Sequence, residues 1–249
     1  MFALSVYHNN YSLNFGEIIM EVSTTTLYSD CKQIIESLRF KIGTHEAMRI
    51  FISHWCYLQT NMYKPSDDEL EIAEKFKNEF SKLQHLIHHM AVVLGESDPL
   101  GILLTEYSSA QNNFDFFPTP ACLSDLLGKL IGGSLNEVKQ NDTVKISEIC
   151  VGTGSIILNK IEQLYVENLE RDIPLKGYEV YLEEINPLCC KALFLQILFK
   201  LEHLENLYGK SSEMRVLQIL NVDVLSRKNY GINFLYTSPT LELNSLSAA

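Results

Sequence analysis

The fold is decided by the stretch Ile146-Ser147-Glu148-Ile149-Cys150-Val151-Gly152-Thr153-Gly154-Ser155. Its first half predicts a buried strand, and the residues after the two glycines predict a helix. Gly152 and Gly154 can take backbone angles that are closed to other residues and carry no Cβ, so a ligand can lie against the main chain at the N-terminus of that helix. A lone Gly-x-Gly is a weak signal. The alternative is that the two glycines only form a tight turn between strand and helix.

Composition and charge limit the class of protein. Of the 249 residues, 46% are hydrophobic and 20% charged, which is ordinary for a globular protein. The formal net charge of -11 points away from nonspecific nucleic-acid binding, because Lys and Arg supply most of the affinity for phosphate. Six scattered cysteines without a Cys-x-x-Cys pair favour reduced thiols over a disulfide framework or a zinc site. With no leader-like or membrane-spanning segment in view, we expect a cytoplasmic location and no membrane insertion.

The first half of the chain has helical periodicity. We expect an irregular arm over 1–28, with one short strand at 17–22, and a helical domain over 29–110. Helices are predicted at 29–42, 45–62 and 66–94, with a further short helix at 98–107. The third begins with a capping box, in which Ser66 and Glu69 can satisfy each other's free amides.

Three histidines on that third predicted helix are candidate metal ligands. His85, His88 and His89 stand at i, i+3 and i+4, a spacing that can bring two imidazoles to one ion. No further ligand stands at a recognisable spacing. We therefore interpret them as surface or boundary histidines and expect no metal.

The second half, residues 111–249, alternates strands and helices. This order predicts a parallel α/β sheet with crossover connections, in which ligands bind at the carboxyl ends of the strands. After a polar connection, Thr119 and Pro120 suit the start of a helix over 121–131. The strands are expected at 144–149, 178–183, 215–220 and 232–236, and the helices between them at 155–169 and 187–204.

Three segments of this half resemble one protein family. They are Phe116-Phe117-Pro118-Thr119-Pro120, Glu148-Ile149-Cys150-Val151-Gly152-Thr153-Gly154-Ser155 and Glu184-Ile185-Asn186-Pro187-Leu188. They are similar to the aromatic-Thr-Pro, glycine and acid-x-Asp-Pro motifs of class I S-adenosylmethionine-dependent methyltransferases, specifically adenine-N6 DNA methyltransferases of the type I restriction-modification kind. Glu148 stands where that family usually has Asp. The resemblance covers roughly residues 98–241.

The resemblance implies a Rossmann-like methyltransferase sheet and a site for S-adenosylmethionine. In such a site Glu184 would hold the ribose hydroxyls and Asp223 would approach the adenine ring. Each has an alternative: Glu184 can cap the helix that follows it, Glu179 competes for the ribose role, and Asp223 can be an ordinary loop acid. The cofactor-binding residues implied by the resemblance are Phe117, Thr119, Glu148, Gly152, Gly154, Glu184 and Asp223.

The catalytic motif of that family is altered here. The family has Asn or Asp followed by Pro-Pro and an aromatic residue, which bind the target amino group and stack on the flipped base. This chain has Leu235-Tyr236-Thr237-Ser238-Pro239-Thr240-Leu241, so Ser238 and Pro239 mark the degenerate motif and no catalytic residue is assigned. Transition-state stabilisation should suffer more from this loss than cofactor binding.

Only nine residues follow Thr240, so we expect the sheet to be incomplete at its C-terminal end and the chain to contain no target-recognition domain. The favoured hypothesis is a degenerate, noncatalytic methyltransferase-like protein, a pseudoenzyme that serves as an adaptor or structural subunit of a larger protein complex. One alternative is an active adenine-N6 DNA methyltransferase completed by a partner, and only this alternative requires DNA as a partner. Another is a regulator that binds S-adenosylmethionine without transferring its methyl group.

Overall fold

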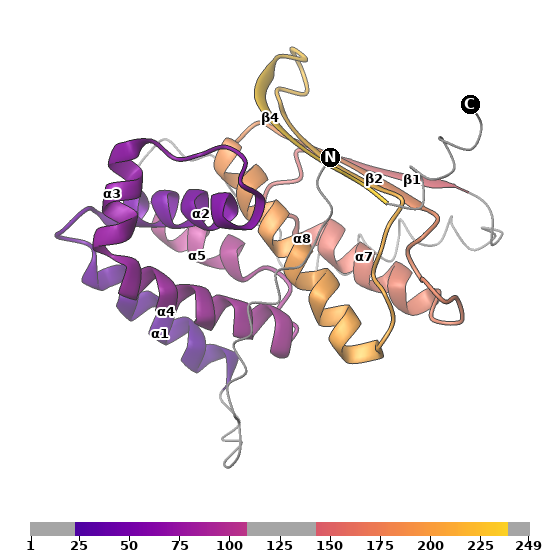
Figure 1. The fold of residues 1–249 in the computed structure, drawn as a ribbon, viewed down its shortest axis with the longest axis horizontal. Coiled ribbons are helices and arrows are strands. Elements are labelled where there is room, and N and C mark those ends of the chain that lie inside the picture. The colour runs from indigo at the N-terminus through magenta and orange to yellow at the C-terminus, as the bar shows by residue number, and fades with distance from the viewer. Residues whose placement is uncertain (1–22, 109–142, 239–249) are drawn as a thin grey trace.

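The computed structural model describes residues 23–108 and 143–238 and has an α/β fold with a four-stranded mixed sheet (Figure 1). The expected strand at 17–22 and the expected helix at 121–131 lie outside the described residues. The helices are α1 (Thr24–Ser37), α2 (Thr44–Thr60), α3 (Asp67–Lys75), α4 (Lys77–His88), the π-helix η1 (His89–Val93), α5 (Pro99–Ser108), α7 (Ser155–Glu167) and α8 (Pro187–Tyr208). The strands are β1 (Val144–Ile149), β2 (Tyr178–Glu184), β3 (Val216–Val222) and β4 (Asn229–Thr237).

The strand order is β1-β2-β3-β4, and the first three strands are parallel. The last strand runs antiparallel to β3, so the expectation of an all-parallel sheet is wrong for β4. The physical reason is the short connection at 223–228. A parallel crossover needs about a dozen residues or more, whereas a short loop joins antiparallel neighbours. The loop is closed by a hydrogen bond from the Asp223 amide to the Lys228 carbonyl, 2.9 Å long.

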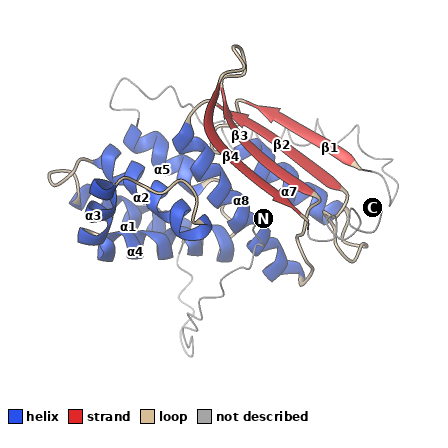
Figure 2. Ribbon diagram, turned by 45° about the horizontal axis from the view of Figure 1, so that its top comes forward, coloured by secondary structure: helices blue, strands red, loops and turns tan. Residues whose placement is uncertain are grey.

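Helices α7 and α8 lie on the same face of the sheet (Figure 2). Because successive strands are added in one direction, right-handed crossovers place both helices on that side. The alternating side chains of the strands that point toward the helices are buried, including Ile146, Val180, Leu182, Ile219 and Phe234.

The opposite face of the sheet carries ion pairs between charged side chains as well as exposed apolar residues, among them Ile149 and Leu235. There Glu179 forms an ion pair with Arg215 over 2.9 Å, and Glu183 binds Arg227 through two contacts of 2.7 and 2.8 Å. Parallel sheets usually carry helices on both faces, so their strands are apolar throughout. Among the described residues, these ion pairs distinguish this face from the apolar face that packs against α7 and α8.

The predicted capping box is confirmed, but the long helix predicted at 66–94 is divided. The Ser66 Oγ accepts a hydrogen bond from the Glu69 amide, and the Glu69 carboxylate accepts one from the Ser66 amide. The helix then breaks at Phe76, whose backbone angles (φ -110°, ψ 25°) leave the helical region, and continues as α4 and η1. Phe76 is buried, with Lys41 and Lys75 over its ring, so tertiary packing overrides the local helical preference at this residue.

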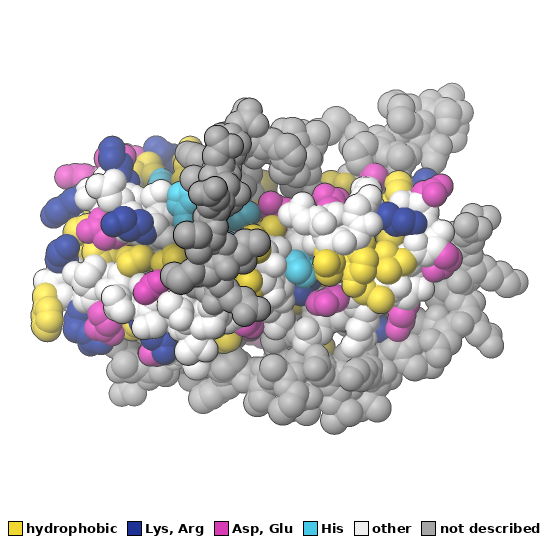
Figure 3. Space-filling view, turned by 90° about the horizontal axis from the view of Figure 1, so that it is seen from below, with side chains coloured by type: hydrophobic (Ala, Val, Ile, Leu, Met, Phe, Trp, Pro, Cys, Tyr) yellow, Lys and Arg dark blue, Asp and Glu magenta, His cyan; other side chains and the backbone are white. Residues whose placement is uncertain are grey.

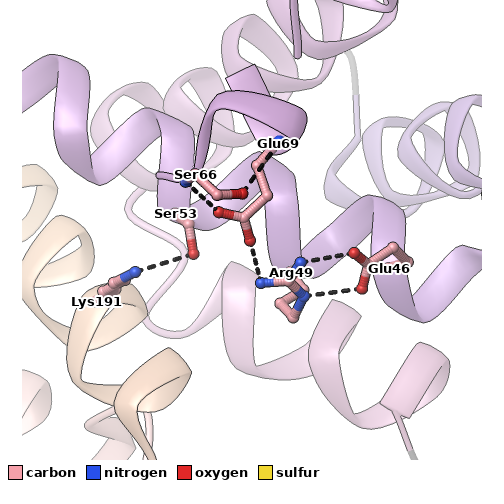
Figure 4. A network of polar contacts seen from close by, with 6 residues as sticks. All are labelled: Glu46, Arg49, Ser53, Ser66, Glu69 and Lys191. Carbon is pink, nitrogen blue, oxygen red and sulfur yellow. Dashed lines mark hydrogen bonds and ion pairs between the residues drawn. The ribbon is translucent and has the colours of Figure 1, made fainter. Parts of the chain in front are cut away.

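The helices of the first half pack around α8, so both halves of the described chain share one hydrophobic core. Trp55 on α2 contacts Phe199 on α8 with ring centroids 4.9 Å apart. Figure 4 shows the polar part of this contact: the Lys191 ammonium on α8 donates to the Ser53 hydroxyl on α2 over 3.1 Å. Beside it, Arg49 joins α2 to α3 by binding the carboxylate of the capping residue Glu69.

At Asn233, the free edge of β4 is covered by the side chain of Tyr63. The Tyr63 hydroxyl donates to the Asn233 carbonyl and accepts from the Asn233 amide, over 2.8 and 2.6 Å. Its ring packs edge-on against Phe234 at 5.2 Å. At this residue the edge strand therefore offers no free backbone groups to another strand.

The helical surface opposite the sheet carries exposed apolar side chains at the C-terminal ends of α7 and α8. Val166, Leu207 and Tyr208 are exposed there, and Figure 3 shows hydrophobic side chains gathered on this face. No helix among the described residues is both long and apolar enough to cross a membrane.

Candidate ligand-binding site at the carboxyl edge of the sheet

The glycine turn follows β1 and leads into α7. Cys150, Gly152 and Gly154 all have positive φ, at 55°, 60° and 100°. A non-glycine residue such as Cys150 rarely adopts this conformation, so the turn is strained at its first residue. Gly154 is the N-cap of α7 and has no side chain to accept from the first turn of the helix. The turn therefore brings backbone amides and a positive helix dipole to the carboxyl edge of the sheet.

Gly154 is also required by packing. A Cβ built on it would lie 2.3 Å from the Leu193 Cδ1, and Leu193 is fully buried in α8. Packing in a tight strand–helix turn therefore explains why residue 154 is a glycine, and no ligand is needed to explain it.

Glu184 lies beside the glycine turn, as the sequence predicted for a shared site. Its Oε2 accepts a hydrogen bond from the Gly152 amide over 2.8 Å, and its Oε1 accepts from the Asn186 amide over 2.7 Å. The helix α8 is capped by Asn186 instead, whose Oδ1 accepts from the Leu188 and Cys189 amides. Glu184 thus joins the turns that follow β1 and β2, and its carboxylate oxygens can accept further hydrogen bonds.

Glu179, the alternative to Glu184, lies elsewhere. It is near the start of β2, and its carboxylate pairs with Arg215 and accepts a 3.0 Å hydrogen bond from the Tyr181 hydroxyl. Since β1 and β2 are parallel, the start of β2 is at the opposite edge of the sheet from the glycine turn. The structure therefore brings Glu184, and not Glu179, to the turn.

Glu148 is at the end of β1, on the side of the strand that faces the helices. Burial of this carboxyl raises its pKa to about 7. It has no hydrogen bond or ion pair with another described residue, so no positive charge in this part of the chain offsets its desolvation. An unpaired, half-buried acid beside a glycine turn is a frequent feature of binding sites.

Asp98, which the sequence analysis did not single out, binds the glycine turn from the start of α5. Its carboxylate accepts hydrogen bonds from the Thr153 hydroxyl over 3.0 Å, the Gln196 amide over 2.8 Å and the Gly101 backbone amide over 3.0 Å. Burial raises the pKa of Asp98 to about 6, and the three hydrogen bonds oppose that rise. The one local signal was an Asp directly before Pro99 at a helix start, which is typical of an N-cap.

Asn221 is a second residue that the sequence analysis missed. It lies at the end of β3 next to Glu184, and its amide donates to the carbonyls of Glu184 and Ile185 over 3.0 and 2.7 Å. The side chain is fully buried, and its Oδ1 has no hydrogen-bond partner among the described residues. Its amide thereby holds the backbone that follows β2 in place.

Asp223 serves the hairpin turn between β3 and β4. Its carboxylate accepts from the Leu225 and Ser226 amides over 2.9 and 3.3 Å and from the Ser226 hydroxyl over 2.7 Å. These bonds, the one from the Ser226 hydroxyl above all, lower the pKa of Asp223. This geometry accounts for Asp223 as a loop acid, which was the alternative to a contact with adenine.

The described part of the degenerate motif, up to Ser238, does not lie beside the glycine turn. Ser238 follows the end of β4, and because β4 is antiparallel, this end is at the amino-terminal edge of β3. There the Ser238 amide donates to the Arg215 carbonyl over 3.0 Å, and its hydroxyl contacts the Glu213 carboxylate. Ser238 therefore lies at the opposite edge of the sheet from the glycine turn. Pro239, Phe117 and Thr119 lie outside the described residues.

Two of the three histidines on the third predicted helix have polar partners in the structure. His88 Nε2 lies 3.1 Å from the Glu202 carboxylate, and His85 Nδ1 lies 2.6 Å from the Ser81 carbonyl oxygen. Within residues 23–108 and 143–238, no group of three His, Cys, Asp or Glu side chains is arranged to hold a metal ion.

No protein-family model, curated protein or solved structure matches this chain. The resemblance to methyltransferases therefore depends on the sequence motifs quoted above.

Proposed function

We propose that this chain is a noncatalytic, methyltransferase-like protein with a Rossmann-like sheet, which acts by binding. Its ligand would be an adenosyl compound such as S-adenosylmethionine, held at the carboxyl edge of β1 and β2. The observation that carries the proposal is the contact between the Gly152 amide and the Glu184 carboxylate, which places a glycine turn and an acid at one point of that edge. Parallel α/β sheets bind nucleotide-like ligands at this edge.

Three observations support binding over catalysis. Ser238 of the altered catalytic motif lies at the opposite edge of the sheet, hydrogen-bonded to Arg215. The Asp and Asn side chains near the glycine turn, Asp98, Asn186 and Asn221, are hydrogen-bonded to neighbouring groups of the fold, whereas transfer to adenine requires an Asn or Asp that binds the target amino group beside a stacking aromatic ring. The formal net charge of -11 also argues against DNA as a substrate, because DNA enzymes usually bind their substrate with clustered Lys and Arg side chains.

A protein partner belongs to the same proposal. Val166 near the end of α7 and Leu207 and Tyr208 at the end of α8 are exposed, and the Tyr208 ring lies 5.7 Å from the Tyr165 ring of α7, so the ends of the two helices form one area that carries apolar side chains. Such an area suits contact with another protein more than contact with nucleic acid. We accordingly propose an adaptor or structural subunit of a larger complex.

Calorimetric titration with S-adenosylmethionine tests the ligand. We expect saturable binding by the wild type and its loss in Gly152→Asp, because the new carboxylate would meet the ligand at the turn. Gly209→Asp is the matched control: Gly209 also has positive φ, 68° against 60° at Gly152, and a Cβ there meets nothing within 4 Å. Equal binding by both variants, or no heat with the wild type, would contradict the proposed ligand.

A further inference from the structure

The glycine turn is held from outside the sheet by three side chains, which we name the Asp98 clasp: Asp98, Thr153 and Gln196. They come from the start of α5, from the turn itself and from the middle of α8, and all three are buried. The Thr153 hydroxyl and the Gln196 amide both donate to the Asp98 carboxylate, and the Gln196 amide also donates to the Thr153 carbonyl over 2.7 Å. Both polar groups of Thr153 that face the clasp are therefore satisfied within it.

The clasp also fixes the start of α5. The Gln196 Oε1 accepts a hydrogen bond from the Leu100 amide over 2.9 Å, and Asp98 accepts one from the Gly101 amide. A Cβ built on Gly101 would lie 2.3 Å from the Asp98 carboxylate and 2.4 Å from the Thr153 Oγ1. Only glycine allows the helix to approach the turn this closely, so the contact depends on the residue type at 101 as well as on the clasp.

We propose that Asp98 is a positioning residue for the ligand site: through Thr153 and Gln196 it holds the glycine turn in the binding conformation and couples the helical half to that turn. This inference rests on the proposed function, because it concerns the same turn. Thr153 lies between Gly152 and Gly154, so a loss of its two clasp contacts frees the residues on either side. Freedom at the turn would lower ligand affinity, because the binding conformation would be populated only part of the time.

The clasp is expected to depend on pH. An ionised Asp98 accepts all three hydrogen bonds, whereas protonation turns one acceptor position into a donor and weakens that set. The titratable groups around Asp98 are Glu96 in the preceding loop, Tyr28 on α1 and Cys189 on α8. Burial raises the pKa of Tyr28 and Cys189, so both stay neutral near pH 6. Burial also raises the pKa of Glu148, at the end of β1, to about 7, so the pH effect of Asp98 must be isolated by mutation.

Hydrogen exchange of the turn tests the proposal without a ligand. The reporter amides are those of Val151, Gly152 and Gly154, which donate to the Glu183 carbonyl, the Glu184 carboxylate and the Val151 carbonyl. We expect Thr153→Val to speed their exchange about tenfold, the effect of about one lost buried hydrogen bond. Thr105→Val is the matched control, since its hydroxyl donates to the Gly101 carbonyl within α5.

Asp98→Ala and Asp98→Asn complete the experiment. The alanine variant should loosen the turn as Thr153→Val does. The asparagine variant keeps two acceptor contacts and can donate to the Thr153 hydroxyl, so it should rescue the protection. The three hydrogen bonds hold the pKa of the buried Asp98 carboxyl below the value that burial alone would give, so loosening the turn while Asp98 stays buried raises that pKa and is favoured as the pH falls. Protection in the wild type, corrected for intrinsic exchange, should therefore fall as the pH drops from 7.5 to 5, and this slope should be smaller in Asp98→Asn.

The same variants are then titrated with S-adenosylmethionine. The expected result is about a tenfold weaker Kd for Thr153→Val and Asp98→Ala, following the loss of protection. Unchanged exchange of the turn in both variants would overturn the positioning role, whatever the ligand does. If the turn loosens but the wild type shows no heat, the proposed ligand is overturned and the clasp remains a structural contact only.

Discussion

Glu148 combines a half-buried carboxyl with the absence of any described partner, and its stability effect has a definite sign. Burial raises its pKa from 4.5 to about 7, so the folded state favours the protonated form. The stabilising contribution is fully present below pH 4.5 and is lost as the pH rises through 7. At pH 8, Glu148→Gln should therefore have a higher free energy of unfolding than the wild type, by up to about 3 kcal/mol in urea denaturation. Near pH 4.5 the two proteins should have the same free energy of unfolding. Equal differences at both pH values would contradict this.

At the residue scale, the sequence predicts that the glycine turn and Glu184 meet, but it does not predict the side chains that hold the glycine turn in place. The pairing of Gly152 with Glu184 follows from two parallel strands whose ends meet at one edge. Asp98 and Gln196 could not be assigned to the turn, because the first lies 55 positions before Thr153 and the second 43 after it. Neither has a local pattern other than the N-cap of α5. Their roles come from packing between helices that sequence periodicity does not place.

At the element scale, the contact between the glycine turn and α8 gives a prediction about Gly154. A Cβ at this residue would stand 2.3 Å from the buried Leu193 Cδ1, and φ is 100°. Gly154→Ala should cost about 2–4 kcal/mol of unfolding free energy, from overpacking together with backbone strain. Gly209→Ala has positive φ and open space, so it should cost only the strain, about 1 kcal/mol. Denaturant unfolding of the two variants separates the cost of overpacking from the cost of backbone strain. A similar decrease in unfolding free energy in both variants would show that α8 moves to accommodate the new Cβ.

Elements with clear periodicity were predicted well, and errors occur where tertiary structure decides. The strands at 144–149 and 178–183 and the helix starting at Pro187 agree closely with β1, β2 and α8. The orientation of β4 was wrong because the strand pattern of 232–236 fits either direction. The predicted bounds leave residues 221–231 between the third and fourth strands, whereas in the structure both strands are longer at these ends and the loop shortens to 223–228, a length that fits antiparallel neighbours.

For the whole molecule, the sequence predicts a helical domain over 29–110 and an α/β domain over 111–249, and this division stays a prediction. The residues at 109–142, which contain the expected boundary, lie outside the described part of the chain. What the structure adds is a hydrophobic core that continues from α1–α5 through α8 to the sheet. The contact was not readable from the chain because α8 is apolar on nearly all sides, so its sequence does not say which neighbours it packs against.

A shared core predicts that both halves unfold together. Trp55, the single tryptophan, reports on the helical half, while amide exchange in β2 and β3 reports on the sheet. Both signals should change at the same denaturant concentration. Phe199→Ala removes the ring that packs on Trp55 from α8 and should lower both midpoints together, by about 3–5 kcal/mol of unfolding free energy. Phe40→Ala is the control, since Phe40 is 97% exposed and should change stability by no more than about 0.5 kcal/mol. If Phe199→Ala moves the fluorescence midpoint and leaves the sheet amides unchanged, the halves are separate folding units and the contact through α8 is only a docking surface between them.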